Sequence, residues 1–119
     1  MLGAKALPTG SPATQRTGSD LMSSSTLLTE DEITAALSAL PDWQRSGDSI
    51  TRTADAADFP AAIRVVNAAA EAAERLNHHP DIDIRWRTLT FVLSTHSAGG
   101  LTGLDFQLAA LIDQAFERA

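Results

Sequence analysis

The chain has 119 residues, of which 44% are hydrophobic and 20% charged, and this composition is typical of one soluble globular domain. A formal net charge of −6 argues against unspecific nucleic-acid binding, and no apolar run approaches the roughly 20 residues of a membrane span. The lack of cysteine excludes disulfides and thiolate metal sites, and without a recognisable signal peptide we expect a cytoplasmic protein.

Residues 1–26 are rich in Gly, Pro, Ser, Thr and Ala and have no repeating apolar face. We expect a disordered N-terminal tail over this segment and a single folded domain over residues 27–119. Met22 lies near the end of the tail, so translation could start at Met1 or at Met22.

The domain should open with a helix. Thr29 and Glu32 have the spacing of a capping box, in which each side chain satisfies a free amide of the first turn. Apolar residues then recur at helical spacing until Pro41 ends the helix. Between Trp43 and Ala54 the pattern changes, and a Gly-Asp pair within β-prone segments predicts a hairpin of two short strands.

A second, longer helix should begin at Asp58, a good N-cap, with Pro60 in its first turn. It should end near Asn77, because Pro80 disfavours helix just before it. We expect one face of this helix to form part of the core, through Phe59, Ile63, Val66, Ala70 and Ala73.

From residue 82 to residue 95 the apolar period becomes two, which indicates one or two strands. A Gly-Gly break follows, and Thr102 should cap a last helix whose buried stripe contains Leu104, Leu108, Leu111, Ile112 and Ala115. The element order α-β-β-α-β-β-α predicts an α+β fold of two layers, a four-stranded antiparallel sheet with three helices on one face. Exposed sheet edges and the last helix's wide apolar stripe predict a homodimer or homotetramer.

The three histidines of the chain lie within one stretch of 19 residues, at His78, His79 and His96. The first two follow the second helix and the third ends the strand pair, so a strand pair that turns back could bring them together. Histidine exchanges protons near neutral pH, which suits a cluster to acid–base chemistry. The helix C-terminus and Glu74, one turn earlier, would both favour a protonated His78.

Plainer interpretations remain open at this point. A single histidine is most often a surface or satisfied core residue. Three histidines could hold zinc, although adjacent side chains tend to point apart, which makes such a site awkward. Asp105 could simply stabilise the first turn of the last helix. Trp43 and Trp86 are more often core residues than ligand platforms.

Four groups of residues are spaced as in one known family: residues 74–80, with the sequence ERLNHHP, then Trp86, then residues 94–96, STH, and finally Asp105. In this spacing the chain resembles the pterin-4a-carbinolamine dehydratases, and the resemblance covers residues 27–119. The chain differs from many members of this family directly after Trp86, where it has Arg-Thr and they have Asn-Lys.

The resemblance implies a dehydratase, a hydro-lyase that converts 4a-hydroxytetrahydrobiopterin into quinonoid dihydropterin and water and so supports tetrahydrobiopterin recycling. Aromatic amino-acid hydroxylases would supply this pterin substrate. One group must give a proton to the leaving hydroxyl and another must take one from the ring, so histidines suffice and no metal or other cofactor is required.

Site roles follow from the same resemblance. His78 and His96 would be the acid–base pair, and His79 would bind the pterin and assist proton transfer. Supporting or substrate-binding roles fall to Glu74, which would orient His78, to Pro80, which would shape the loop, and to Trp43 and Trp86 as pocket walls.

Two other functions compete with catalysis. Members of this family also act as a dimerisation cofactor for a homeodomain transcription factor, so the scaffold could serve as a partner-binding module. It could also bind a pterin as a regulator, without turnover. The complete histidine set favours an enzyme, because binding alone would not need it.

Overall fold

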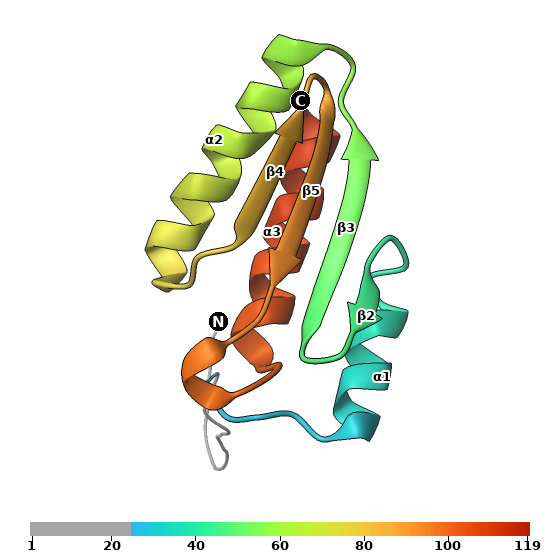
Figure 1. Ribbon diagram of the computed structural model, residues 1–119, viewed down its shortest axis with the longest axis vertical. Helices are drawn as coiled ribbons and strands as arrows, with labels where there is room; N and C mark the ends of the chain where they lie inside the picture. The colour runs from blue at the N-terminus through green and yellow to red at the C-terminus, as the bar shows by residue number, and fades with distance from the viewer. Residues whose placement is uncertain (1–24) are drawn as a thin grey trace, which may run out of the picture.

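The computed structural model describes residues 25–119, which form three α-helices and one four-stranded sheet (Figure 1). In chain order these are α1 (Glu30–Ser38), β2 (Gln44–Ser46), β3 (Ser49–Asp55), α2 (Phe59–Leu76), β4 (Asp81–Arg85), β5 (Thr88–Leu93), the short 3-10 helix η1 (His96–Ala98) and α3 (Gly103–Arg118). The predicted α+β class and the order α-β-β-α-β-β-α are confirmed. The predicted tail, apart from its last two residues, lies outside the described residues.

The sheet is antiparallel throughout, with strand order β2-β3-β5-β4. In β5 the side chains of Leu89, Phe91 and Leu93 are fully buried, and the Phe91 ring packs edge-on against Phe116 of α3, with 6.0 Å between the centroids. Each such large apolar side chain contributes about 1.5–3 kcal/mol on burial. The alternate positions of β5 lie on the opposite, open face and are only half-buried.

The helix ends form as the sequence predicts. Thr29 and Glu32 make a complete capping box on α1. Asp58 caps α2 by accepting a 2.8 Å hydrogen bond from the Ala61 amide. Asn77, at φ 49°, adopts the left-handed conformation that ends α2, and it reverses the chain into β4.

The buried face of α2 differs from the predicted one. Its core residues are mainly alanines: Ala61, Ala62, Val65, Ala69, Ala72 and Ala73. Of the predicted residues only Ala73 is among them, whereas Phe59 is 47% exposed and Ala70 is also exposed. Small side chains let α2 approach α3 closely, so the alanine face packs inward although it is the less hydrophobic one.

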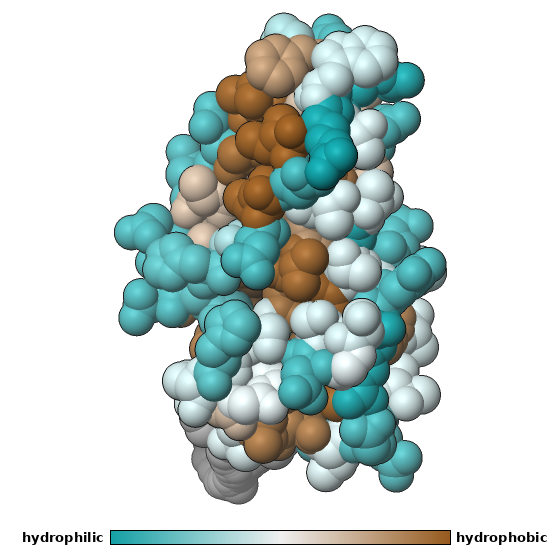
Figure 2. Space-filling view, in the orientation of Figure 1, coloured by the Kyte–Doolittle hydropathy of each residue, from teal (hydrophilic) through white to brown (hydrophobic). Residues whose placement is uncertain are grey.

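Three of the four exposed large apolar side chains of the described residues lie on β4 or near its C-terminal end, and the fourth is Leu27. Phe59 at the start of α2 and Ile84 on β4 are 47% and 43% exposed, and Trp86 in the β4–β5 turn is 71% exposed. Figure 2 shows apolar side chains gathered over the upper part of α2 and β4. None of the helices between residues 25 and 119 is both long and apolar enough to cross a membrane.

The positions of the exposed apolar side chains change the surface on which we expect the predicted homo-oligomer to form. Leu108, Ile112 and Ala115 of α3 are buried within the chain, so most of that stripe lies in the core, whereas Leu104 and Leu111 are half-buried. The exposed Ile84 instead lies on β4, an edge strand of the sheet. We expect light scattering at micromolar concentration to give a mass of at least two chains, and Ile84→Glu to lower it. A single-chain mass at every concentration would contradict this prediction.

Candidate active site

An open pocket of about 390 Å³ lies at the end of the sheet where β5 leaves it. This volume is within the usual range of small-molecule sites. The pocket is lined by Asp48, Ser49, His79, Asp81, Val92, Ser94, His96 and Gly99. Two of the three histidines thus border one concave surface.

The strand register explains how these residues meet. Val92 occupies an outward position of β5, and its partner across the ladder is Asp81 of β4. On the other side of β5, Ile50 pairs with Leu93, which sets Ser49 of β3 beside Ser94. The floor of the pocket is therefore the open face of β5, with β3 on one side and β4 on the other.

His79 projects from the turn between α2 and β4, and its side chain is 59% exposed. Its Nε2 atom lies 2.6 Å from Oε2 of Glu74. The expectation that Glu74 supports His78 is wrong, because the left-handed Asn77 turns the chain so that His79 faces the last turn of α2. Glu74 therefore orients His79.

His78 points into the domain and is only 8% exposed. Its Nε2 atom lies 2.6 Å from Oδ1 of Asp105, which is fully buried. The other oxygen of Asp105 accepts hydrogen bonds from the Thr95 hydroxyl at 2.8 Å and from the Thr102 amide at 2.9 Å. Asp105 thus completes the capping box of α3, as its plain interpretation predicts, and also holds His78.

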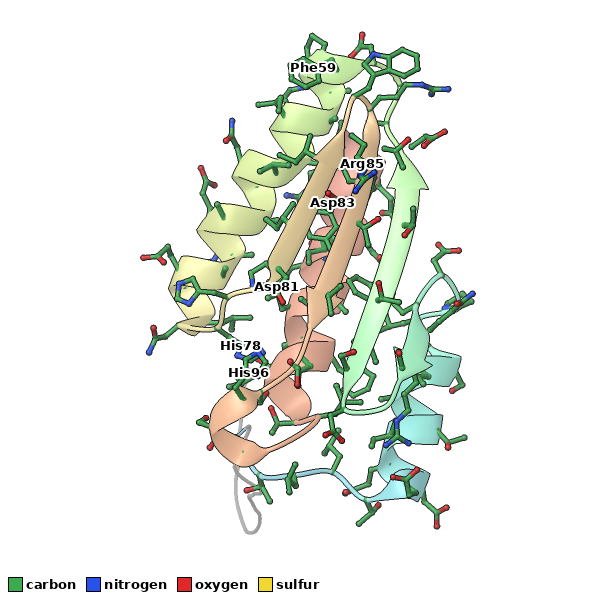
Figure 3. All side chains as sticks on the ribbon, in the orientation of Figure 1. Phe59, His78, Asp81, Asp83, Arg85 and His96 are labelled. Atoms are coloured by element: carbon green, nitrogen blue, oxygen red, sulfur yellow. The ribbon has the colours of Figure 1, made fainter. Side chains whose placement is uncertain are left out.

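His96 is the first residue of η1 and lies in a compact loop whose two ends are joined by backbone hydrogen bonds. Thr95 and Gly100 exchange backbone hydrogen bonds of 3.0 and 3.3 Å, and Gly99 takes the left-handed conformation at φ 79°. Because Thr95 is also bound to Asp105, the loop that presents His96 is tied to the group that holds His78. Figure 3 shows His78 and His96 at the same end of the sheet, below Asp81.

The two tryptophans do not line this pocket. Trp43 is buried, and its indole N–H donates a 2.8 Å hydrogen bond to Asp113 of α3. Trp86 lies at φ 55° in the turn between β4 and β5, whereas His79 precedes β4 and His96 follows β5, at the other ends of the two strands. Pro80 joins two lining residues, His79 and Asp81, without being one itself.

Several lining residues were not singled out from the sequence. Val92 could have been found, because it shares the period-two face of β5 with Ser94. Asp81 could have been found as the first residue after the histidine motif. Asp48 and Ser49 come from a hairpin about 30 residues upstream of the histidines, so only the strand pairing reveals them.

The local charges are mainly carboxylates and imidazoles. In the part of the chain that the structure describes, no three His, Asp or Glu side chains converge closely enough to hold a metal ion. Beside the pocket's Asp48, Arg45 pairs with Glu30 and donates a 2.9 Å hydrogen bond to the Gly47 carbonyl. The hydrogen bond from Arg45 lowers the pKa of Glu30 below its usual value.

Known proteins share both this sequence and this fold. The family model for pterin 4 alpha carbinolamine dehydratase matches residues 26–115. A Nocardia farcinica protein whose name assigns it to the same family is 66% identical over 88 residues, which cover 74% of this chain and 93% of the relative. A Mycobacteroides abscessus protein with the same name is 55% identical over 92 residues, or 77% and 98% of the two chains.

The structural comparison agrees. A crystal structure from Brucella melitensis, described as a transcriptional coactivator/pterin dehydratase, superposes with a TM-score of 0.73 at 36% identity. The match covers 75% of this chain and 97% of that one. Together with the histidine pocket, these matches show that the chain belongs to the pterin 4 alpha carbinolamine dehydratase family.

Proposed function

We propose that this chain is a dehydratase that removes water from a 4a-hydroxytetrahydropterin and releases a quinonoid dihydropterin. The observation that carries this proposal is the pocket bordered by His79 and His96, with His78 fixed on Asp105 behind them. Family membership supports the same reaction. As the resemblance implies, the substrate would come from aromatic amino-acid hydroxylation, and the product would return to tetrahydropterin recycling.

The chemistry requires two proton transfers. The bond between C4a and the hydroxyl oxygen breaks, its electron pair leaves with the oxygen, and a proton from an imidazolium completes the water molecule. The ring nitrogen next to C4a loses its proton to a second, neutral imidazole, and a C4a–N double bond forms. Groups that titrate near neutral pH can perform both steps, each worth about 10²–10⁴-fold in rate.

We assign these transfers to the two histidines that reach the pocket, His79 and His96. The sequence favoured His78 and His96, but His78 is nearly buried and its Nε2 atom is bound to Asp105. In this proposal His78 is a positioning residue, since Asp105 links it through Thr95 to the loop that carries His96. Glu74 orients His79 through the 2.6 Å contact between its Oε2 atom and Nε2 of the histidine.

A partner-binding role is the second candidate, and one surface favours it. Phe59, Ile84 and Trp86 are exposed apolar side chains, and Phe59 lies at the end of the molecule opposite His78 and His96 (Figure 3). The Brucella melitensis relative is itself described as a coactivator as well as a dehydratase. This surface is separate from the pocket, so the two roles are compatible.

A stopped-flow assay separates the candidates. Freshly generated 4a-hydroxytetrahydropterin is mixed with the protein in the presence of a metal chelator, and pterin binding is measured in parallel. We expect accelerated dehydration that saturates with substrate. Binding without acceleration would indicate a non-catalytic regulator. If the protein neither binds the pterin nor accelerates its dehydration, only the partner-binding role would remain.

A further inference from the structure

Two carboxylates, Asp48 and Asp81, line the pocket. Among the described residues neither side chain makes a hydrogen bond, and Asp48 interacts with Arg45 through its charge. The lining residues of this part of the chain include no Lys or Arg. The pocket therefore suits a ligand that offers hydrogen-bond donors, and it disfavours one that carries phosphate or carboxylate groups.

The two carboxylates lie on opposite sides of the pocket floor. Asp81 begins β4 beside His79, whereas Asp48 immediately precedes β3. Both strands pair with β5, so at the usual spacing of roughly 4.8 Å they lie roughly 10 Å apart. A flat ligand of two fused six-membered rings can span this floor from His79, beside β4, to Asp48, beside β3.

The backbone at Asp48 is held in place. The Ser94 hydroxyl donates a 2.7 Å hydrogen bond to the Asp48 carbonyl, which joins this turn to β5. The carboxylate faces the η1 loop, with Oδ1 3.7 Å from the position that a Cβ on Gly100 would take. Arg45, the nearby cation, makes its hydrogen bonds to Glu30 and the Gly47 carbonyl and interacts with Asp48 through its charge alone.

We propose that Asp48 is the specificity residue that binds the amino-pyrimidine edge of the pterin, an inference that rests on the proposed dehydratase function. In a pterin, C2 and its amino group lie directly across the pyrimidine ring from C4a. If C4a is placed beside His79, at the β4 side of the pocket, the 2-amino group and N3–H therefore point across the floor toward the β3 side, where Asp48 lies. These two parallel donors fit the two oxygens of one carboxylate, in the way that a guanidinium does.

The inference predicts which ligands and variants lose affinity. Equilibrium binding is measured for 7,8-dihydropterin and for 7,8-dihydrolumazine, which has an oxygen in place of the 2-amino group. The wild-type chain should bind the amino compound about 10- to 100-fold more tightly, the usual worth of charge-assisted hydrogen bonds. Asp48→Asn should bind dihydropterin as weakly as the wild-type chain binds dihydrolumazine, and should discriminate little between the two.

Asp83→Asn is the matched control. It makes the same charge change two residues farther along β4 from Asp81 (Figure 3), outside the pocket lining, and should leave the preference intact. If Asp48→Asn keeps the full preference, or if Asp81→Asn abolishes it instead, the role of Asp48 is wrong while the dehydratase proposal stands. If the wild-type chain binds no dihydropterin at all, the proposed function falls, and this inference with it.

Discussion

His96→Ala should lower the rate of carbinolamine dehydration by about 10²–10⁴-fold, the usual worth of a positioned acid or base. His96 lines the pocket from an exposed loop, so the fold should not depend on its ring. Stopped-flow kinetics of the variant give the rate, and circular dichroism with a melting curve shows whether the domain is intact. A wild-type rate in a folded variant would contradict the assignment.

His79→Ala should cause a loss of the same order, since His79 is the second histidine of the pocket. The comparison with His78→Ala then decides between the two acid–base pairs. We expect His78→Ala to affect melting temperature as well as rate, because its ring is bonded to a buried carboxylate. If His78→Ala loses more rate than His79→Ala without losing stability, the pair favoured by the sequence is the correct one.

Asp105→Ala should destabilise the domain by about 3–5 kcal/mol, because three polar groups in the interior lose the carboxylate to which they are hydrogen-bonded. The Asp105 carboxylate is fully buried and binds His78, Thr95 and the Thr102 amide. In a domain of this size, such a loss corresponds to a fall in melting temperature of more than about 10 °C. Chemical denaturation measures the free energy of unfolding directly.

Glu32→Ala is the control for Asp105→Ala. Glu32 holds the same third position in the capping box of α1, but it is only half-buried, so its removal should cost at most about 1 kcal/mol. Equal losses in the two variants would mean that Asp105 acts only as a helix cap. A conservative Asp105→Asn should recover part of the stability and still lower the dehydration rate, because only one of the two polar atoms of an amide can accept the hydrogen bonds that both carboxylate oxygens make.

Local features of this fold were predictable because they depend on neighbouring residues. The capping box at Thr29 and the N-caps at Asp58 and Thr102 all form as the sequence predicts. The predicted alternation of apolar side chains in β5 is confirmed as an alternation of buried and half-buried residues, since a strand with one buried face has a strict period of two. These short-range signals were enough to give the element order.

Features that depend on packing were not predictable in the same way. The core face of α2 was misassigned because hydrophobicity favours Phe59 and Ile63, whereas close packing against α3 favours the alanine face. Of the stripe predicted on α3, Leu108, Ile112 and Ala115 are buried, whereas Leu104 and Leu111 are half-buried. The error on α2 concerns how closely two helices approach, which depends on the size of the side chains on both helices.

The sequence motif contains all three histidines, of which His79 and His96 line the pocket. Their hydrogen-bond partners could not be predicted, since the partner of Glu74 depends on a single left-handed residue, Asn77. The role of Asp105 depends on α3 packing beside the end of α2. Asp48 enters the pocket only through the pairing of β3 with β5.

The most direct test of the dehydratase proposal compares wild-type protein and His96→Ala in one stopped-flow experiment, with 4a-hydroxytetrahydropterin as substrate and a chelator present. The account predicts saturable acceleration by the wild-type protein and a loss of about 10²–10⁴-fold in the folded variant. Dehydration at the spontaneous rate with wild-type protein, or equal acceleration by both proteins, would contradict it.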